Sequence, residues 1–242
     1  MSQAADLTAR ETEVIRILRV LRSRSDRFVV IGGYAVSALA SHRFSVDCDV
    51  VVSEKDLESF EEVLTGEGYQ QAKASNVNKG IHGAKTAKHV KLIGGRRVSV
   101  DLSINSVVCR DTGGEWSYEL LMQNSTEANV VGVTDSTVAF VPKKELLIAM
   151  KLHPARDTDV RDVVMMGGEA DWNVVADFAD TGTRTKLVKQ LDSAIERLGS
   201  SEFPSSLKAE FGLRIDVPPL ISETVQRLMT MKEQVDKKPS RS

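Results

Sequence analysis

The sequence has little of several features that mark whole classes of protein. Its 242 residues include two cysteines, Cys48 and Cys109, too few for a disulfide-rich scaffold and without the spacing of a zinc site. No apolar run approaches the roughly 20 residues that a membrane helix needs. The N-terminal segment carries acids and bases where a signal peptide needs an apolar stretch. We therefore expect a cytoplasmic protein with reduced thiols and no membrane partner.

An excess of charge of either sign is also missing. Lys and Arg number 32 against 34 Asp and Glu, which gives a formal net charge of -2. Such a balance provides no overall attraction to nucleic acid, so a polyanion would have to bind a local patch. The segment 73–97 contains no acid and could supply that patch, although a solvated loop explains it equally well. Its basic side chains are Lys73, Lys79, Lys85, Lys88, Lys91, Arg96 and Arg97.

The hydrophobic content of 41% is enough for a packed core, and its spacing predicts an α/β order of elements. Residues 8–24 have the apolar stripe of a surface helix. A short strand at 27–31, a glycine turn, a short helix at 34–42 and an alternating strand at 44–52 follow. A further helix begins at Ser53. We expect a mobile loop at residues 72–87 and a hairpin with a Gly–Gly turn at residues 88–104. Residues 110–128 look irregular.

The later part of the chain predicts two short strands at 129–133 and 137–141, and then helices. Pro142 opens the first helix, which Pro154 ends or kinks. The expected organisation is one α/β domain at 1–168, a helical region at 169–235 and a frayed tail at 236–242.

Two aspartates interrupt the apolar strand in FSVDCDVVV. Side chains alternate along a strand, so Asp47 and Asp49 project from one face with Cα atoms roughly 6.5 Å apart. If the second hairpin strand is their neighbour, Asp101 comes onto the same face while Cys48 faces the core. Three carboxylates with room for water and phosphate oxygens suit Mg²⁺ or Mn²⁺. The alternative is a set of solvent-exposed strand positions.

The glycine pair predicts a phosphate site beside these carboxylates. Gly32 and Gly33 precede a helix N-terminus, where backbone N–H groups can approach a phosphate closely. Metal on one side and backbone donors on the other would hold a nucleoside triphosphate (NTP) for in-line attack at its α-phosphorus. The sequence therefore predicts transfer of a nucleoside monophosphate (NMP) to an acceptor hydroxyl, with release of pyrophosphate.

These motifs resemble the DNA polymerase β superfamily of nucleotidyltransferases. Its signature joins a Gly-Gly or Gly-Ser pair, a short helix, an Asp pair and a third Asp on a later strand. Gly32, Gly33, Asp47, Asp49 and Asp101 each match. We expect an α/β nucleotidyltransferase fold with a mixed, mainly antiparallel sheet, an N-terminal helix and a C-terminal helical region.

Two further segments resemble the AbiEii-type branch, the toxins of type IV toxin-antitoxin pairs. In that branch an Arg and a small hydroxyl residue precede the Asp pair, as Arg43 and Ser45 do here, and a downstream element joins Lys, Arg and paired Asp, as in KLHPARDTDVRD. The resemblance implies phosphate contacts for Lys151 and Arg156, and an antitoxin protein as partner. Arg43 and Ser45 would orient the Asp pair or contact phosphate, or else simply pair with Asp47 or cap a strand.

Several interpretations stay open at this point. An RNA end such as tRNA, bound through segment 73–97, is the favoured acceptor, and a protein side chain is the next choice. A non-catalytic NTP-binding or protein-interaction module is the alternative function, favoured by Pro154 and by Thr158 where the branch usually has Lys. Asp159 and Asp162 are expected to hold Arg156 or Arg161 in place. We expect His82, His89 and His153 to lie near solvent or phosphate. Trp116 and Trp172 are expected to pack in the protein interior.

Overall fold

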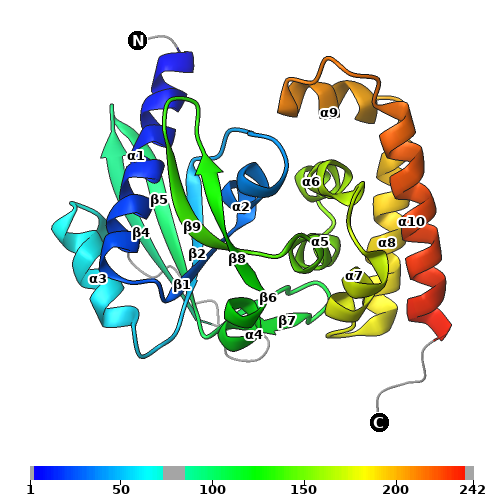
Figure 1. Ribbon diagram of the computed structural model, residues 1–242, viewed down its shortest axis with the longest axis horizontal. Coiled ribbons are helices and arrows are strands. Elements are labelled where there is room, and N and C mark those ends of the chain that lie inside the picture. The colour runs from blue at the N-terminus through cyan, green and yellow to red at the C-terminus, as the bar shows by residue number, and fades with distance from the viewer. Residues whose placement is uncertain (1–2, 73–84, 238–242) are drawn as a thin grey trace. The chain divides into compact units, whose positions relative to one another are not determined.

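The computed structural model describes residues 3–72 and 85–237 and divides the chain into two compact units (Figure 1). Unit 1 comprises Met1–Val108 and Trp116–Lys143, and unit 2 comprises Cys109–Glu115 and Lys144–Ser242. The boundary expected between residues 168 and 169 falls inside unit 2 and stays a prediction. The loop expected at 72–87 lies mostly outside the described residues, but residues 85–87 belong to a strand.

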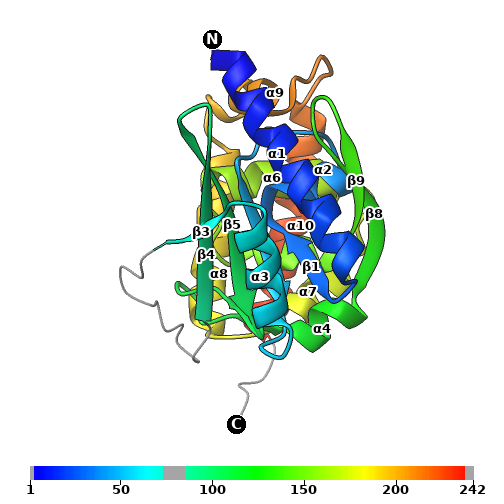
Figure 2. The same ribbon diagram turned by 90° about the vertical axis from the view of Figure 1, so that its left-hand side faces the viewer.

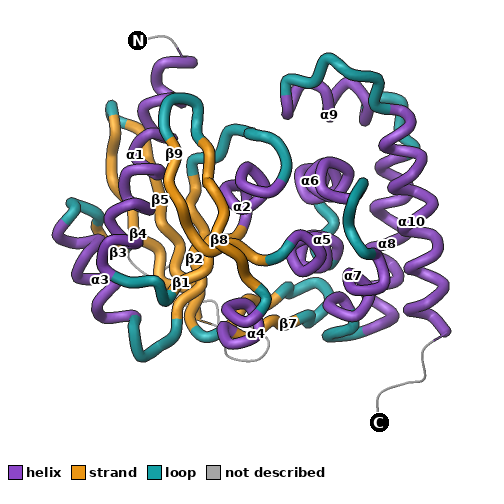
Figure 3. Tube along the Cα trace, viewed as in Figure 1, coloured by secondary structure: helices purple, strands orange, loops and turns teal. Residues whose placement is uncertain are grey.

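Unit 1 is built on a five-stranded sheet (Figure 3). The central pair of strands runs parallel, and the other three neighbouring pairs run antiparallel. The predicted mixed, mainly antiparallel sheet is therefore confirmed, as is the hairpin with its Gly–Gly turn. In spatial order the strands are β1 (Phe28–Ile31), β2 (Asp47–Val52), β5 (Arg96–Ile104), β4 (Lys85–Ile93) and β3 (Gln70–Gln71).

One face of this sheet packs under two helices, α1 (Gln3–Arg24) and α3 (Leu57–Gly66), which lie on the same side of it (Figure 2). The Phe60 ring of α3 meets Phe28 edge to face, with ring centroids 5.6 Å apart. The apolar stripe predicted for the N-terminal helix is fully buried. Removing this much apolar surface from water is what stabilises the layer. The stripe consists of Val14, Ile15, Leu18 and Leu21.

The strand expected at 44–52 begins only at Asp47, and the helix before it, α2 (Gly32–Leu39), ends earlier than expected. The reason lies in the hydrogen bonds of the loop between them. The Tyr34 hydroxyl donates to the carbonyl of Ser45 at 2.6 Å. Ser37 Oγ contacts the backbone N and O of Arg43, both at 3.4 Å. Because side chains take these backbone groups, residues 40–46 form a loop that follows α2.

Residues 110–128 contain more structure than the sequence predicts. Helix α4 (Tyr118–Gln123) forms there, and Ser117 caps it by accepting a hydrogen bond from the Leu120 N–H at 3.1 Å. A six-residue helix is too short to show a helical period in sequence. The short strands are β6 (Ser106–Val108), β7 (Glu115–Ser117), and the predicted pair β8 (Ser125–Val131) and β9 (Ser136–Pro142).

Unit 2 consists mainly of helices, which confirms the predicted C-terminal helical region. Pro154 lies between the first two of them, so it ends a helix and does not kink one. The last helix includes Asp236 and Lys237, expected in the tail, while 238–242 lie outside the described residues. In the described chain no helix is long and apolar enough to cross a membrane. The helices are α5 (Lys144–Leu152), α6 (Asp157–Gly167), α7 (Trp172–Ala179), α8 (Arg184–Leu198), α9 (Phe203–Phe211) and α10 (Pro218–Lys237).

His153 is wrongly predicted as a neighbour of solvent or phosphate, because it is fully buried within unit 2. Its Nε2 donates to the Ala179 carbonyl at 3.0 Å, so Nδ1 is the acceptor for the Thr112 hydroxyl at 2.5 Å. Burial lowers the pKa of His153 to about 4. The neutral ring therefore ties segment 109–115 to the ends of α5 and α7.

Of the predictions for the other histidines and the tryptophans, one is wrong and two are confirmed. His89 is also buried, on β4, against the expectation of a solvent position. Trp116 and Trp172 pack as predicted, and the indole N–H of Trp172 donates to the Gly167 carbonyl at 3.1 Å. His82 lies outside the described residues.

Acid should destabilise the native state through His153. The pKa of His153 in the folded protein is about 4, below the ordinary 6.5. Between pH 6.5 and 4 the ring is therefore protonated in the unfolded chain and neutral in the native state. The contribution of His153 to the free energy of unfolding should therefore fall by about 3 kcal/mol as the pH drops from 6.5 to 4, and no further below that. Urea denaturation across this range measures the effect. A His153→Gln variant, with no proton to bind at this position, should lose this part of the pH dependence, and an unchanged slope would contradict the assignment.

Candidate functional site

Three aspartates share one face of the unit 1 sheet. In the parallel β2–β5 pair, Asp49 is the register partner of Asp101, and Asp47 is the partner of Ser99. Neighbouring strands lie roughly 4.8 Å apart, and alternate residues of one strand share a face. Cys48, Val100 and Leu102 alternate with these residues and are fully buried on the other face. The structure thus places the three carboxylates together, as the alternation predicts.

Two of these carboxylates have partners on neighbouring strands. Asp47 Oδ1 accepts a hydrogen bond from the Ser99 hydroxyl at 2.6 Å. Asp101 Oδ2 accepts from the Lys88 ammonium at 3.1 Å. The other oxygen of Asp101, Oδ1, is buried and has no hydrogen-bond partner among the described residues. A buried polar atom of this kind calls for a partner that the described residues do not supply.

Ser99 and Lys88 are site residues that the motif search missed, although the sequence contains a signal for each. Ser99 lies two residues before Asp101, so alternation puts both on one face. Lys88 follows from the two-residue turn at Gly94 and Gly95, because such a hairpin pairs residues at equal distances from the turn. Counting outward from the turn brings Lys88 opposite Asp101.

Burial sets the protonation behaviour of this face. Desolvation raises the pKa of the Asp101 carboxyl, while Lys88 opposes that shift. Desolvation also raises the pKa of the Cys48 thiol well above its ordinary value, and the charges of Asp49, Asp101 and Asp47 add to this effect. Cys48 is therefore a core-facing spacer between two acids, as its position in the strand predicts.

The glycine pair meets the same face at the end of β1. Gly32 has φ +67°, and a Cβ there would collide with the Asp49 carboxylate. A Cβ on Gly33 would come within 3.0 Å of the Ser45 side chain and 3.2 Å of the Arg43 guanidinium. Both glycines open α2, where Ile31 at the N-cap has no polar side chain to take the first N–H groups. The pair thus lies between the carboxylates and the loop that carries Arg43 and Ser45.

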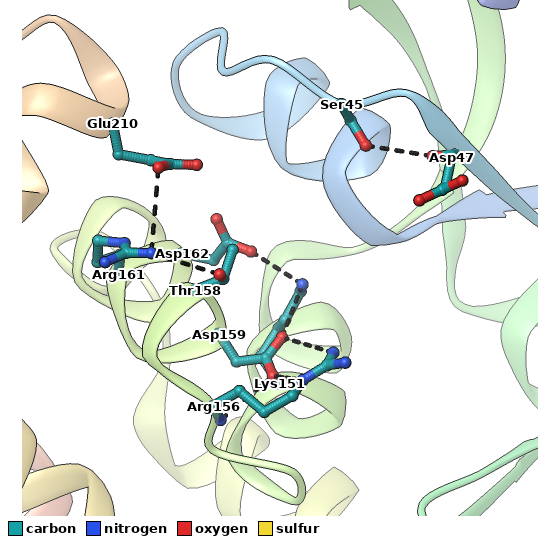
Figure 4. Close-up of polar contacts among 9 residues, drawn as sticks. All are labelled: Ser45, Asp47, Lys151, Arg156, Thr158, Asp159, Arg161, Asp162 and Glu210. Atoms are coloured by element: carbon teal, nitrogen blue, oxygen red, sulfur yellow. Dashed lines mark hydrogen bonds and ion pairs between the residues drawn. The ribbon is translucent and has the colours of Figure 1, made fainter. Parts of the chain in front are cut away.

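That loop brings the remaining unit 1 candidates beside the Asp pair. Arg43 is 8% exposed. Ser45 Oγ donates to the backbone carbonyl of Asp47 at 3.2 Å, so it holds the start of β2 and does not contact the carboxylate (Figure 4). Gly32, Gly33, Arg43 and Ser45 therefore join Asp47 and Asp49 in one region of unit 1.

The two candidates in unit 2 belong to a cluster of four charges (Figure 4). The Lys151 ammonium pairs with Asp159 at 3.0 Å and with Asp162 at 2.8 Å, and its side chain is only 10% exposed. Arg156 Nε pairs with Asp159 at 2.6 Å, but 74% of the arginine side chain is exposed. Asp159 thus holds Arg156, as predicted, and both aspartates hold Lys151, which was not predicted.

The four charges of this cluster balance, which makes the burial of the two aspartates tolerable. Burial alone would raise the pKa of Asp159, but Lys151 and Arg156 outweigh it and keep that pKa below its ordinary value. An exposed guanidinium held by a carboxylate can contact an anion from solvent. Of the two predicted phosphate contacts in unit 2, Arg156 has the accessible charge.

The basic segment is largely neutralised within unit 1. Lys73 and Lys79 lie outside the described residues. Four of the five described cations pair with carboxylates: Lys85 with Glu54, Lys88 with Asp101, Lys91 with Glu13 and Arg96 with Asp6. A polyanion at β4 would therefore compete with acids of the same chain.

The donor set can be tested against the implied metal. Within residues 3–72 and 85–237, no three His, Cys, Asp or Glu side chains converge in an arrangement that could hold an ion. The three aspartates nevertheless offer only oxygen donors on one face, and one buried oxygen of Asp101 has no partner there. Oxygen-only donors are of the type that Mg²⁺ and Mn²⁺ prefer and zinc does not.

Comparison with solved structures identifies the fold. The chain is similar over 100% of both chains to a crystal structure from H. pylori described as a "putative nucleotidyltransferase", with a TM-score of 0.51 and 13% identity. This is the nucleotidyltransferase fold. The structure of JHP933 from Helicobacter pylori aligns at TM-score 0.45 and 14% identity, over 98% of this chain and 93% of that one.

A complex of ANT(2")-Ia with adenylyl-2"-tobramycin aligns at TM-score 0.42 and 16% identity, over 85% of this chain and 98% of that one. No family model matches the sequence, and no curated protein matches it either.

The two cysteines should differ in reactivity. Cys48 is buried and its pKa is raised, so little thiolate is accessible there, whereas Cys109 is partly exposed. Iodoacetamide should modify Cys109 in the native protein and reach Cys48 only after unfolding. Peptide mass spectrometry before and after denaturation measures both sites. Equal labelling of Cys48 in the native state would contradict its placement in the core.

Gly32→Ala should disturb the Asp face. The left-handed backbone at this position costs a residue with Cβ about 1–2 kcal/mol, and the new methyl group would displace the Asp49 carboxylate. We expect a lower free energy of unfolding in urea denaturation. Gly66→Ala is the matched control, since a Cβ at the end of α3 meets open space and helical Ala is favoured by about 0.5–1 kcal/mol. Equal behaviour of the two variants would argue against a close approach of Gly32 to Asp49.

Proposed function

We propose that the chain is a metal-dependent nucleotidyltransferase that moves an NMP from an NTP to an acceptor hydroxyl and releases pyrophosphate. One observation carries the proposal: the parallel register that pairs Asp49 with Asp101 and leaves Asp47 on the same face. Two neighbouring apolar strands gain nothing structural from three carboxylates on one face, because like charges repel and desolvation is costly. A bound cation would offset this repulsion and so account for the position of the three carboxylates.

In this proposal the carboxylates have separate roles. Asp47 and Asp49 would hold Mg²⁺ or Mn²⁺, and Asp101 would hold the catalytic ion as well. When bound, the metal supplies neutralisation of the charge that develops on the transferred phosphoryl group. Asp101 would also take the proton of the acceptor hydroxyl.

Each unit offers candidate phosphate contacts of its own. The N–H groups at Gly32 and Gly33 would bind the β and γ phosphates, with Arg43 beside them. Arg156, with its exposed guanidinium, would contact phosphate in unit 2. Lys151 is held by two carboxylates, so its contribution would be to keep Asp159, and with it Arg156, in position.

The acceptor and the branch also belong to the proposal. An RNA end such as tRNA is favoured, on the resemblance to the AbiEii-type branch and on segment 73–97, and a protein side chain is the next choice. RNA phosphates would have to displace acids such as Glu54 and Asp6 from the cations of β4 and β5, which makes such binding sensitive to salt. An antitoxin protein is the partner that this branch implies.

A second candidate is a non-catalytic NTP-binding or protein-interaction module with the same fold. Pro154 gives it no support, because this residue lies between α5 and α6 and leaves both helices intact. Thr158 in place of the branch's Lys remains in its favour. The Thr158 hydroxyl accepts from the Arg161 guanidinium at 3.3 Å, a contact that a lysine could not make.

Transfer of a labelled nucleotide tests the main proposal. The protein is incubated with each α-labelled NTP, Mg²⁺ or Mn²⁺, and either total RNA or lysate. Wild type should label an acceptor, and Asp47→Asn with Asp49→Asn should lower the rate by about 100-fold or more, since the ion contributes several kcal/mol. Asp26→Asn is the control, as Asp26 pairs with Arg22 on the surface of unit 1.

Two outcomes would speak against an enzyme. No transfer with any NTP and acceptor mixture is one, and transfer that survives in the double variant is the other. Calorimetry then separates the second candidate, because tight NTP binding that needs neither metal nor Asp47 and Asp49 indicates a module that binds without turnover.

A further inference from the structure

Lys88 lies directly across the hairpin from Asp101 and points to the same face of the sheet. The two are register partners in the antiparallel β4–β5 pair. The Lys88 ammonium lies 3.1 Å from Asp101 Oδ2, with 46% of the lysine side chain and 22% of the aspartate side chain exposed. Its neighbours in β4, Lys85 and Lys91, pair instead with Glu54 and Glu13. Among these three lysines, Lys88 is the one that contacts an aspartate of the proposed metal site.

The charge of this face explains what such a contact does. Three carboxylates on one face carry three negative charges when ionised, and Lys88 offsets one of them. An ammonium and a divalent cation repel each other and both seek the same carboxylate oxygens. The lysine therefore stabilises the three aspartates while no ion is bound and opposes the entry of one.

We propose that Lys88 is a positioning residue that competes with the divalent ion for Asp101 and so makes tight metal binding depend on the nucleotide. This inference rests on the proposed function. With Lys88 on Oδ2, the metal-free site binds an ion weakly. A triphosphate adds negative charge beside the ion and offsets the ammonium, so metal and NTP bind together.

Binding of Mn²⁺ without nucleotide tests the competition, by calorimetry or by the electron spin resonance of free Mn²⁺. Lys88→Met removes the charge and keeps the aliphatic stem, so this variant should bind Mn²⁺ about tenfold more tightly than wild type. Lys88→Arg keeps the charge and should behave like wild type. Lys85→Met is the matched control, because it removes the same charge from the same strand but from a partner, Glu54, outside the three aspartates. Its Mn²⁺ affinity should not change.

Two further titrations identify the path of the effect. With a non-hydrolysable NTP analogue present, the difference between wild type and Lys88→Met should shrink below about threefold, because the triphosphate offsets the lysine. In an Asp101→Asn background, Lys88→Met should change Mn²⁺ affinity much less than it does in the wild type. This double-mutant cycle isolates the contact between the two side chains.

A labelling measurement on the wild type needs no variant and stands even if Lys88→Met fails to fold. An ion at Asp101 would displace Lys88, so acetylation of Lys88 by an active ester should become several-fold faster when Mn²⁺ is added. Lys85 should react at the same rate with and without Mn²⁺. Peptide mass spectrometry reports both lysines in the same sample.

The outcomes separate this inference from the proposed function. Equal or weaker Mn²⁺ binding by Lys88→Met, no binding by either protein at millimolar Mn²⁺, or unchanged acetylation of Lys88 would overturn the inference. If wild type binds Mn²⁺ and the Asp47→Asn, Asp49→Asn variant does not, the metal site stands even when the role of Lys88 fails. Mn²⁺ binding that ignores Asp47 and Asp49 would instead overturn the proposed function.

Discussion

The parallel pairing of β2 with β5 is the constraint on which the site depends. It sets Asp49 beside Asp101 and Asp47 beside Ser99, although these residues lie about fifty positions apart in the chain. The same register turns Cys48, Val100 and Leu102 into the core. A shift of one residue would bury the acids and expose the apolar side chains, so the hydrophobic core itself enforces the position of the carboxylates. The hydrophobic core and the proposed metal site thus lie on opposite faces of one sheet.

In both units, buried or half-buried carboxylates pair with side chains of the same unit. In unit 1, Ser99 and Lys88 each hold one carboxylate oxygen of the Asp face. In unit 2, two aspartates hold Lys151 within a balanced cluster. The difference lies in how completely the acids are paired: in unit 2 both aspartates contact Lys151, while Asp101 has a buried oxygen without a partner among the described residues. A buried oxygen of this kind calls for a partner, whereas a balanced cluster mainly holds structure.

Sequence reasoning reached the carboxylates because strand alternation is a local rule, and local rules can be read from a linear pattern. It missed Lys88, although the two-residue turn of the hairpin determines that Lys88 pairs with Asp101. It failed for α4, which is too short to show a period, and for the start of β2, where the Tyr34 hydroxyl takes the Ser45 carbonyl. It failed for His153 as well, since a polar ring is buried only if distant groups such as Ala179 meet both of its nitrogens.

The sequence by itself determined which residues alternate, where the glycine pair can open a helix, and which acids share a strand, because these follow from backbone geometry over a few residues. Only the tertiary structure decided which strand lies beside β2. It also decided that Lys151 is closed off while Arg156 is exposed. Such outcomes depend on how separate strands and helices pack, which burial and charge decide and local spacing does not.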